Sequence, residues 1–464
     1  MFAHRKIACI LIPIVLLTMA CQAATRAWQA AFNPSDTPAP RPSATLNPTF
    51  SPTETSTSTR RPVTETASSP PTATLRPTVA ATQIRRHLRV FEEIWNTVAA
   101  EYLYEDFNGV DWDAVYVEYR ERISQGLSDE EFYLAMEELI SGLGDEHSLF
   151  LNPEAAREED AQFAGEYDYV GIGVLNTLIP EKRKVSIVLV FPGSPAEEAG
   201  LKAHDSILAV DGAPILGEDG LRSNLLRGPE GTSVVLTVQS PGEAPREVRV
   251  ERRSIRGATP VPYEILITPS GKRIGYLLLV TFNDITIHEQ VGDILRQMSA
   301  SGRLDGLIID NRQNGGGADT VMKGTLAYFA RGTVGYFVNR QQEVPLNILG
   351  HDINGSQNLP IVVLIGRGTA SFGEIFSGIL QEKRGAYLIG EPTDGNVEIL
   401  WVFEFSDGSR IWLAHDTFQP HGNPEANWEE TGILPDEVVY SSWDEVTMEN
   451  DPVIKTALEH FDQQ

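Results

Sequence analysis

The strongest constraint on the fold is a series of short, continuous apolar strands that alternate with helical patterns after residue 273. Residues 274–280, 306–310 and 361–364 have this strand pattern. Apolar residues at helical spacing follow the first and the third strand, namely Val291, Ile294, Leu295 and Met298, and then Ile375, Phe376, Ile379 and Leu380. Strands that are apolar on both faces must be buried on both faces, so we predict an α/β sheet core covered by helices.

Two other patterns precede this core in a chain of 464 residues, a length that favours two or three domains. Apolar residues recur at helical spacing from residue 85 onward. Ser128, with Glu131 three residues later, predicts a capping box at the start of a third helix. Short strands then replace the helices, at 170–174, 185–190, 207–210, 234–238 and 247–250.

The first 21 residues have the composition of an export signal. Arg5 and Lys6 precede an apolar run over residues 7–19, which is short for a membrane span and has the length of a signal-peptide apolar region. Residues 18–21 resemble the lipobox of bacterial lipoproteins, although Thr18 stands where leucine is usual. We therefore expect an exported chain that is lipidated at Cys21 and anchored to the cell membrane. Simple secretion and an uncleaved anchor are the alternatives.

Residues 22–84 are expected to form a disordered tether. Half of residues 22–83 are Pro, Ser or Thr, and they show no apolar periodicity. Such a segment cannot bury enough apolar area to offset the entropy of ordering it; a Pro-rich ligand segment is the alternative. The formal net charge of −27 argues against nucleic acid as a partner, because few basic groups would be available to neutralise phosphates.

Two turns of the predicted core contain residues that could carry chemistry. Ser371 lies in a segment of small residues, 366–374, that joins a buried strand to a helix. A serine at such a turn is exposed at the sheet edge, where the N–H groups of the helix start can stabilise an oxyanion. A serine that merely caps the helix is the alternative. Residues 310–317 end in three glycines, which either free N–H donors for a ligand or form a plain turn.

Residues 166–256 resemble a PDZ domain. The resemblance rests on four segments, 170–173, 192–201, 205–212 and 227–232. In PDZ domains a Gly-Ile-Gly loop offers backbone N–H groups to the C-terminal carboxylate of a peptide, which adds to the sheet as a strand. The resemblance implies that the loop of Gly171, Ile172 and Gly173 binds peptide C-termini here. The alternative is a PDZ domain that only regulates or packs.

The region from about residue 85 to 440 resembles the C-terminal-processing and tricorn-core serine peptidases. Besides the PDZ domain, matching segments occur in family order at 144–148, 310–317, 369–376, 390–393 and 432–436. The resemblance implies endopeptidase activity on proteins, commonly near their C-termini, and a crotonase-like sheet core. It divides the chain into a signal peptide (1–21), a tether (22–84), a helical domain (85–165), a PDZ domain (166–256), a peptidase core (257–445) and a C-terminal helix or tail (446–464).

This family has two catalytic arrangements, and the sequence favours the second. In the first, a lysine follows the serine at a fixed distance; Asn396 stands at that position, and an amide cannot act as a general base. In the tricorn-like branch a histidine activates the serine. The resemblance then implies Ser371 as nucleophile, His147 as general base and Glu429 as a polar stabiliser of the site. A buried histidine with a structural role is the alternative for His147.

The remaining expectations concern the oxyanion, metals and partners. The resemblance implies oxyanion donors at the backbone N–H groups of Gly316 and Phe372, and His415 and His421 are spare bases if His147 is too distant. The other histidines lack metal-like spacing, so no metal and no cofactor is predicted. The predicted function is a serine endopeptidase for exported or envelope proteins with free C-termini, recruited by the PDZ domain. A catalytically inactive, PDZ-containing peptide-binding protein on the same fold is the alternative.

Overall fold

The computed structural model describes residues 80–464, except residues 146, 164–168, 218–219, 223–224 and 256–257. The predicted signal peptide with Cys21, and the tether as far as residue 79, lie outside the described residues. The predicted tether extended too far, because residues 81–84 form the first turn of a helix. Within the described part of the chain, no helix combines the length and the apolarity that a membrane crossing requires.

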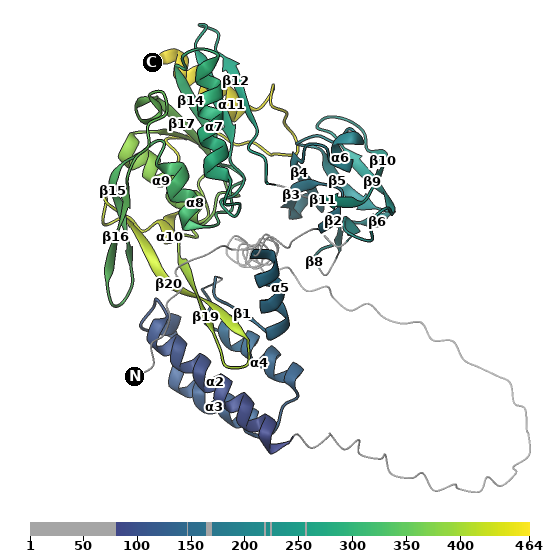
Figure 1. The fold of residues 1–464 in the computed structure, drawn as a ribbon, viewed down its shortest axis with the longest axis vertical. Helices are drawn as coiled ribbons and strands as arrows, with labels where there is room; N and C mark the ends of the chain where they lie inside the picture. Colours follow the sequence, from purple (N-terminus) through teal and green to yellow (C-terminus); the bar gives the residue numbers. More distant parts are fainter. Residues whose placement is uncertain (1–79, 146, 164–168, 218–219, 223–224, 256–257) are drawn as a thin grey trace, which may run out of the picture.

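Three helices form an N-terminal unit at the bottom of Figure 1, α2 (Ala81–Glu101), α3 (Trp112–Ser124) and α4 (Asp129–Ser141). α4 begins as predicted, because Ser128 and Glu131 exchange the two hydrogen bonds of a capping box. The apolar faces of α2 and α4 pack together on β1 (Leu149–Leu151) and on Ile411 and Leu413 of β20 (Arg410–Pro420). These strands thus attach the N-terminal helices to the rest of the molecule.

The long strand β20 joins this unit to the rest of the molecule. Its first residues pair with β1 and with β19 (Ile399–Glu404), and residues 417–420 pair with β15 (Gly332–Val338). β16 (Glu343–Ile348) completes the sheet order β1-β20-β15-β16. One strand therefore supports the N-terminal helices at one end and contacts the core at the other (Figure 1).

The PDZ-like unit is a separate sheet in the order β10-β9-β5-β4-β3. Its strands are β3 (Val174–Ile179), β4 (Lys184–Val190), β5 (Ser206–Val210), β9 (Ser233–Gln239) and β10 (Arg246–Glu251). β3 is an edge strand of this sheet. The strand predicted over 170–174 is in fact split, because Gly173 has a φ of +84° and ends the extended run. Its first part is β2 (Tyr169–Gly171), which pairs with β11 (Arg253–Ile255).

The smaller elements of this unit are α6 (Pro195–Glu198), β6 (Ala213–Pro214), β7 (Leu216–Gly217) and β8 (Gly220–Leu221). α5 (Pro153–Phe163) precedes the unit and belongs to the N-terminal side, where Glu159 pairs with Arg410 of β20 at 2.7 Å. The Ser194 hydroxyl caps α6 by accepting the backbone N–H of Glu197, and Gly200 follows the helix at a φ of +76°.

The peptidase core is built on a sheet in the order β12-β13-β14-β17-β18-β21. These strands are β12 (Tyr263–Ile267), β13 (Arg273–Leu278), β14 (Gly306–Asp310), β17 (Ile361–Ile365), β18 (Tyr387–Gly390) and β21 (Glu437–Val438). Side chains alternate between two apolar clusters: Ile309 and Val363 pack toward the helices α7 (Ile287–Ala300), α8 (Asp319–Leu326) and α9 (Phe372–Arg384). Ile308 and Val362 pack toward α11 (Pro452–Gln463). The predicted α/β core covered on both faces, with N-terminal helices and an inserted PDZ unit, is confirmed.

The segment between β21 and α11 ties the PDZ-like unit to the core. The Trp443 indole N–H donates to the carbonyl of Ile187 in β4 at 3.0 Å. Lys182 and Lys184 form ion pairs with Asp444 at 2.8 and 2.7 Å. Burial alone would disfavour the Asp444 carboxylate, but the hydrogen bonds from the two lysines outweigh it and lower the pKa of Asp444 to about 2.

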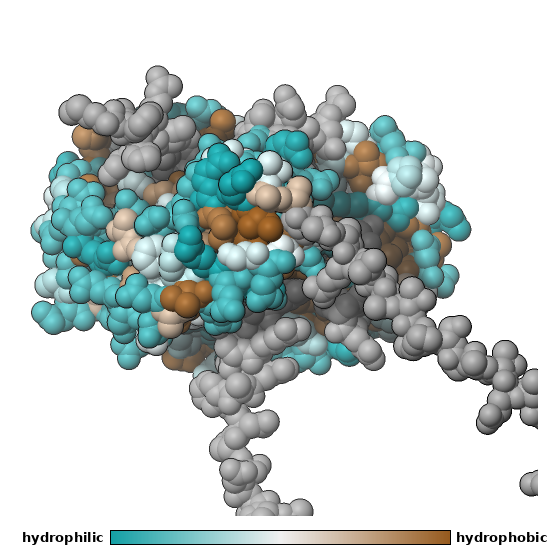
Figure 2. Space-filling model, turned by 90° about the horizontal axis from the view of Figure 1, so that it is seen from below, coloured by the Kyte–Doolittle hydropathy of each residue, from teal (hydrophilic) through white to brown (hydrophobic). Residues whose placement is uncertain are grey.

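The surface agrees with the acidic composition of the chain. Figure 2 shows one face of the molecule as largely hydrophilic, with a few separate apolar patches. Exposed large apolar side chains occur singly on the N-terminal helices, such as Val117 on α3 and Leu134 on α4. Scattered residues of this kind are normal on a globular surface.

Candidate active site

Ser371 occupies the turn between the buried strand β17 and the buried helix α9. It is the residue immediately before the helix and has a φ of +53° and a ψ of −128°, a conformation that only glycine adopts without strain. Its backbone N–H donates to the carboxylate of Glu374 at 3.1 Å. The three residues before it, Gly368, Thr369 and Ala370, are small, which permits the sharp turn that the sequence predicts. The strained serine is held by its surroundings, as is common at functional sites.

The glycine-rich loop after β14 packs against this turn. A Cβ added to Gly316 would lie 2.7 Å from the Ser371 Cβ and 3.1 Å from the Phe372 nitrogen, so only glycine allows this approach. The backbone N–H of Gly316 donates to Oδ1 of the buried Asn314 at 2.9 Å. This predicted oxyanion donor is therefore already engaged. The N–H of Phe372, in contrast, makes no hydrogen bond to any described residue.

Glu374 connects the Ser371 turn to the loop at residues 393–396 by hydrogen bonds. Besides the Ser371 N–H, its carboxylate accepts the Thr393 hydroxyl at 2.5 Å and the backbone N–H groups of Gly395 and Asn396 at 3.1 and 2.8 Å. Burial raises the pKa of Glu374 to about 7 despite these hydrogen bonds. The carboxylate thereby fixes the loop that carries Asn396 close to the nucleophile turn.

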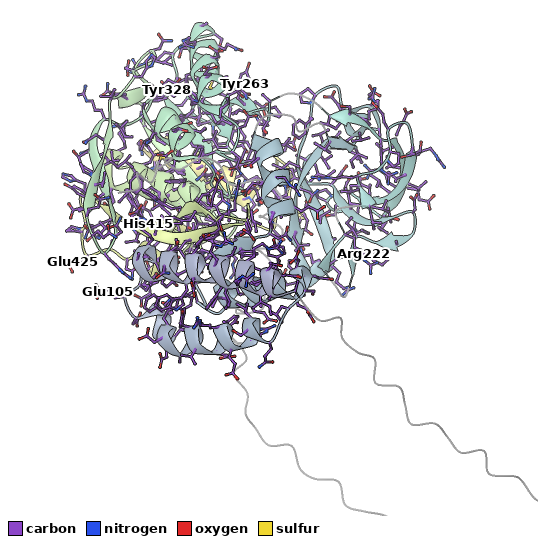
Figure 3. All side chains as sticks on the ribbon, turned by 60° about the horizontal axis from the view of Figure 1, so that its bottom comes forward. Glu105, Arg222, Tyr263, Tyr328, His415 and Glu425 are labelled. Carbon is purple, nitrogen blue, oxygen red and sulfur yellow. The ribbon has the colours of Figure 1, made fainter. Side chains whose placement is uncertain are left out.

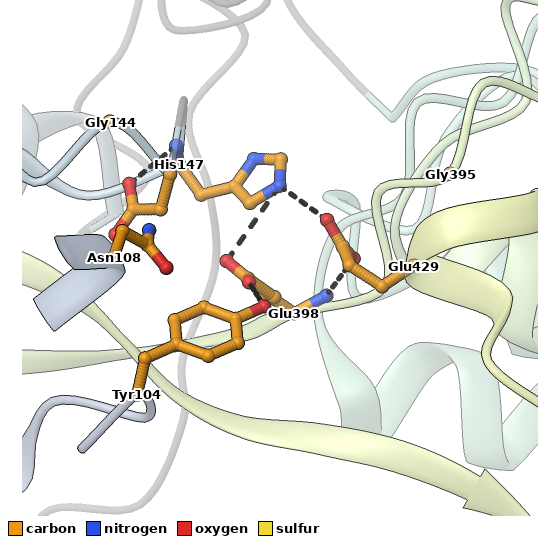
Figure 4. Close-up of a pocket in the computed structure, with 8 residues that line it drawn as sticks. Tyr104, Asn108, Gly144, His147, Gly395, Glu398 and Glu429 are labelled. Atoms are coloured by element: carbon orange, nitrogen blue, oxygen red, sulfur yellow. Dashed lines mark hydrogen bonds and ion pairs between the residues drawn. The ribbon is translucent and has the colours of Figure 1, made fainter. Parts of the chain in front are cut away.

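A cluster of polar side chains lies where the N-terminal unit meets the core, and Figure 4 shows these side chains. Nε2 of His147 lies 3.0 Å from Oε1 of Glu429 and 3.7 Å from Oε2 of Glu398. The other oxygen of Glu429 accepts the backbone N–H groups of Val397 and Glu398 at 2.7 and 3.2 Å. The other oxygen of Glu398 accepts the hydroxyl of Tyr104. His147 comes from the turn between α4 and β1, and Glu429 from α10 (Trp428–Thr431).

The charges of this cluster depend on one another. Burial disfavours the charged form of His147, but the hydrogen bond to Glu429 and the charges of Glu398 and Glu429 prevail and raise the pKa of His147 to about 9. Burial raises the pKa of Glu398 to about 8. Burial also acts on Glu429, but its hydrogen bond with His147 lowers the pKa of Glu429 below its ordinary value. At neutral pH, His147 is therefore an imidazolium paired with the Glu429 carboxylate.

Comparison with known proteins identifies the family. Residues 273–439 match Peptidase family S41, residues 86–141 the Tricorn protease C1 domain, and residues 186–240 a PDZ domain. The chain is 34% identical over 381 residues to the carboxyl-terminal-processing protease of Synechocystis sp., which covers 79% of this chain and 84% of that protein. The chain belongs to peptidase family S41. It is thus a member of the C-terminal processing serine peptidases, with a PDZ domain.

Two further S41 relatives extend the comparison. The chain is 26% identical to the chloroplastic carboxyl-terminal-processing peptidase 2 of Arabidopsis thaliana, over 75% of this chain and 68% of that protein. The solved structure of the photosystem II D1 C-terminal processing protease aligns with a TM-score of 0.56 and 26% identity, over 76% of this chain and 93% of that chain. Its fold is therefore shared across most of the described residues.

The predicted Ser-His-Glu arrangement of Ser371, His147 and Glu429 is wrong. Family S41 uses a Ser-Lys dyad. The structure supplies the physical reason: Nε2 of His147 faces Glu429, and among the described residues no hydrogen bond joins His147 to Ser371. An imidazolium with a pKa of about 9 cannot accept the serine proton at neutral pH.

At the position that the sequence analysis matches to the lysine of the family dyad, this chain has Asn396. The backbone of Asn396 is fixed by Glu374, yet its amide side chain cannot act as a general base. The chain thus departs from its family at this residue.

The two spare histidines have other contacts. His415, labelled in Figure 3, stacks on Trp401 with ring centroids 4.2 Å apart and contacts Oε2 of Glu101 in α2 at 3.2 Å. His421 lies 3.2 Å from the hydroxyl of Tyr336. Both histidines belong to contacts of β20 and the loop after it, and neither hydrogen-bonds to Ser371 within the described part of the chain.

The predicted carboxylate-binding loop of the PDZ domain connects β2 to β3. The backbone N–H groups of Ile172 and Gly173 donate to no described residue, which leaves them free for a ligand. The Ile172 side chain is buried in the domain core, and a Cβ on Gly173 would lie 2.3 Å from the Ser194 Cβ. The predicted role of Gly171, Ile172 and Gly173 in binding peptide C-termini stays a prediction.

Sequence reasoning missed two residues of the polar cluster, Glu398 and Tyr104. Glu398 directly precedes β19, and Tyr104 follows α2, so neither lies in a recognisable motif. No sequence spacing connects Glu398 or Tyr104 with His147, because these residues come together only in the tertiary structure.

Proposed function

We propose that Ser371 is the nucleophile of this S41 peptidase and attacks the carbonyl carbon of a scissile peptide bond. The observation that carries the assignment is its strained backbone at the turn between β17 and α9, with a φ of +53°. Nucleophilic serines commonly occupy such strained strand-to-helix turns, which present Oγ above the sheet. The N-terminus of α9 adds partial positive charge where the oxyanion would form.

Two backbone groups would stabilise that oxyanion. The N–H of Phe372 has no partner among the described residues, and the N–H of Gly316 lies beside it but is bound by Asn314. A substrate carbonyl recruits the second donor by displacing the Asn314 side chain. The displacement leaves Oδ1 of the buried Asn314 without this donor, which costs about 1–3 kcal/mol, and the new hydrogen bond to the oxyanion offsets this cost.

Reactivity toward an active-site probe tests the nucleophile. A fluorophosphonate should label the wild type, and Ser371→Ala should abolish the label because the hydroxyl is the group that reacts. Ser377→Ala is the matched control, since Ser377 lies in α9, the helix that follows Ser371, and its hydroxyl donates to the carbonyl of Gly373. Undiminished labelling of the Ser371→Ala variant would refute the assignment.

The missing lysine gives a second test. A positioned general base contributes about 10²–10⁴-fold to turnover. Because Asn396 cannot provide one, Asn396→Lys should raise turnover of a peptide substrate at least about tenfold. Asn396→Met, which has a similar length but no amine, is the control and should leave turnover unchanged. Equal turnover of both variants would show that the absent lysine does not limit this enzyme.

Asn396 also favours a second candidate function, a protein that binds peptides on the same fold but does not cleave them. In that case the chain binds a peptide with a free C-terminus, while Ser371 reacts with no fluorophosphonate and no cleavage product accumulates. Mass spectrometry of a peptide incubated with the wild type separates the two candidates directly.

Substrate recruitment falls to the PDZ domain in this proposal. β3 is an edge strand and follows two unpaired N–H groups, so an extended peptide can add to it while its carboxylate meets Ile172 and Gly173. Substrates would be exported or envelope proteins with free C-termini.

The signal-like residues 1–21 support export, with a lipid on Cys21 holding the enzyme at the cell membrane. Cys21→Ser should release the chain from the membrane fraction; unchanged membrane association would count against the anchor.

A further inference from the structure

We propose that His147, Glu398 and Glu429 form a binding site for one divalent transition-metal cation, with Zn²⁺ as the best-fitting ion. The three side chains offer Nε2, Oε2 and Oε1, and these ligand atoms all lie within 4.8 Å of one another. The cation binds the neutral imidazole, so it displaces the proton of His147 into solvent. Ser371 is not one of the proposed ligands, and the proposal does not depend on the role of Ser371.

The geometry of the three ligand atoms suits a small cation. Metal–ligand bonds of about 2.0–2.2 Å in a tetrahedral site separate neighbouring ligand atoms by about 3.3–3.6 Å. The distances from Nε2 of His147 to the oxygens of Glu429 and Glu398, 3.0 and 3.7 Å, bracket that value. The third separation, between the two carboxylate oxygens, is within 4.8 Å. These oxygens therefore move together by at most about 1.2 Å when all three atoms bind a common cation.

Each carboxylate is oriented by the protein so that one oxygen remains for the cation. Oε1 of Glu398 is held by the Tyr104 hydroxyl, while its Oε2 is buried and has no hydrogen-bond partner among the described residues. Glu398 is only 4% exposed, so water does not readily solvate this oxygen. Oε2 of Glu429 is held by the N–H groups of Val397 and Glu398. Outer contacts of this kind orient the ligands of a metal site.

The site has an open side. His147, Glu398 and Glu429 line a cavity of about 270 Å³ together with Tyr104 and Asn108. Three protein ligands plus an open position for water or a substrate group is the arrangement of reactive zinc sites, whereas structural sites usually have four protein ligands. Imidazole and carboxylate together favour Zn²⁺ over Mg²⁺, which prefers oxygen ligands and retains its waters.

Metal binding to the full chain tests the proposal. Metal-free protein is dialysed against Zn²⁺, and bound metal is measured by mass spectrometry; the wild type should hold one Zn²⁺ per chain. Glu398→Gln removes a ligand charge with little change of shape and should weaken Zn²⁺ binding at least about tenfold, and Tyr104→Phe should weaken it by about tenfold through the lost orienting contact. Glu430→Gln, an exposed neighbour of Glu429, is the matched control and should bind as the wild type does.

Two further measurements make the outcome decisive. Co²⁺ in the site should give the intense visible absorption of a four-coordinate ion, which does not depend on any variant being folded. Ser371→Ala should bind Zn²⁺ normally, which separates this site from the nucleophile. Failure of the wild type to bind one Zn²⁺ per chain, or unaltered affinity in a folded Glu398→Gln variant, would overturn the proposal.

Discussion

Replacing Gly316 by alanine should damage catalysis far more than it damages the fold. Gly316 has a φ of +90°, and an added Cβ would lie 2.7 Å from the Ser371 Cβ. Carbon atoms normally approach to about 3.5–4.0 Å, so the contact forces the nucleophile turn and the loop apart by about 1 Å. A misplacement of this size can cost about 10²-fold in rate, which corresponds to about 2.7 kcal/mol of transition-state stabilisation.

The same substitution carries a backbone cost that must be separated from the effect on the site. Alanine at such a φ costs about 1–3 kcal/mol of folding free energy. Gly332 is a matched control, because its φ of +83° is similar and an added Cβ there meets nothing within 4 Å. We therefore expect Gly332→Ala to lose comparable stability in urea unfolding and to keep its turnover. Gly316→Ala should lose about 100-fold in turnover of a peptide substrate. Turnover of Gly316→Ala within twofold of that of Gly332→Ala would refute the reasoning.

Three further predictions concern stability and peptide binding. Asp444→Asn should lower the free energy of unfolding by about 2 kcal/mol at neutral pH. The folded pKa of Asp444 is about 2, below its unfolded value of 3.8. This contribution to the free energy of unfolding is therefore complete above pH 4 and is lost as the pH falls through 2. A difference between variant and wild type in urea unfolding that did not depend on pH would contradict this prediction. Gly173→Val should abolish binding of a peptide with a free C-terminus, measured by fluorescence polarisation, while probe labelling of Ser371 persists. Ser128→Ala should cost about 1 kcal/mol through the lost helix cap, and a change below 0.3 kcal/mol in chemical denaturation would show that the cap is not needed.

Local patterns predicted the fold well because they report burial directly. The strands at 306–310 and 361–365 are apolar at every position but the terminal Asp310, and each is packed on both faces, as continuous apolar runs require. The capping box at Ser128 follows from two residues in one turn, so tertiary contacts could not alter it. The Ser371 turn was predictable for the same reason, since small residues between a buried strand and a helix permit few geometries.

The details of the site depend on contacts that no local pattern reports. Gly316 was expected to present a free N–H, but this N–H donates to the side chain of Asn314. The Asn314 side chain is oriented by its hydrogen bond to the buried Asn311, which no sequence pattern reports. The assignment of His147 as a base failed because it rested on a matching motif, which does not report the charge of an imidazole. Whether an imidazole is basic depends on its neighbours, and the carboxylates beside His147 hold the proton on it.

The long strand β20 has a consequence for how the chain matures. The apolar side of the N-terminal helices is covered by Ile411 and Leu413, which the ribosome adds some 270 residues after the end of α4. At about 5–20 residues per second, that hydrophobic side stays uncovered for roughly 15–50 s of synthesis. During this interval the nascent chain must avoid aggregation, either by pausing in an incompletely folded state or by binding a chaperone. A fragment that ends before β19 should accordingly be insoluble on its own.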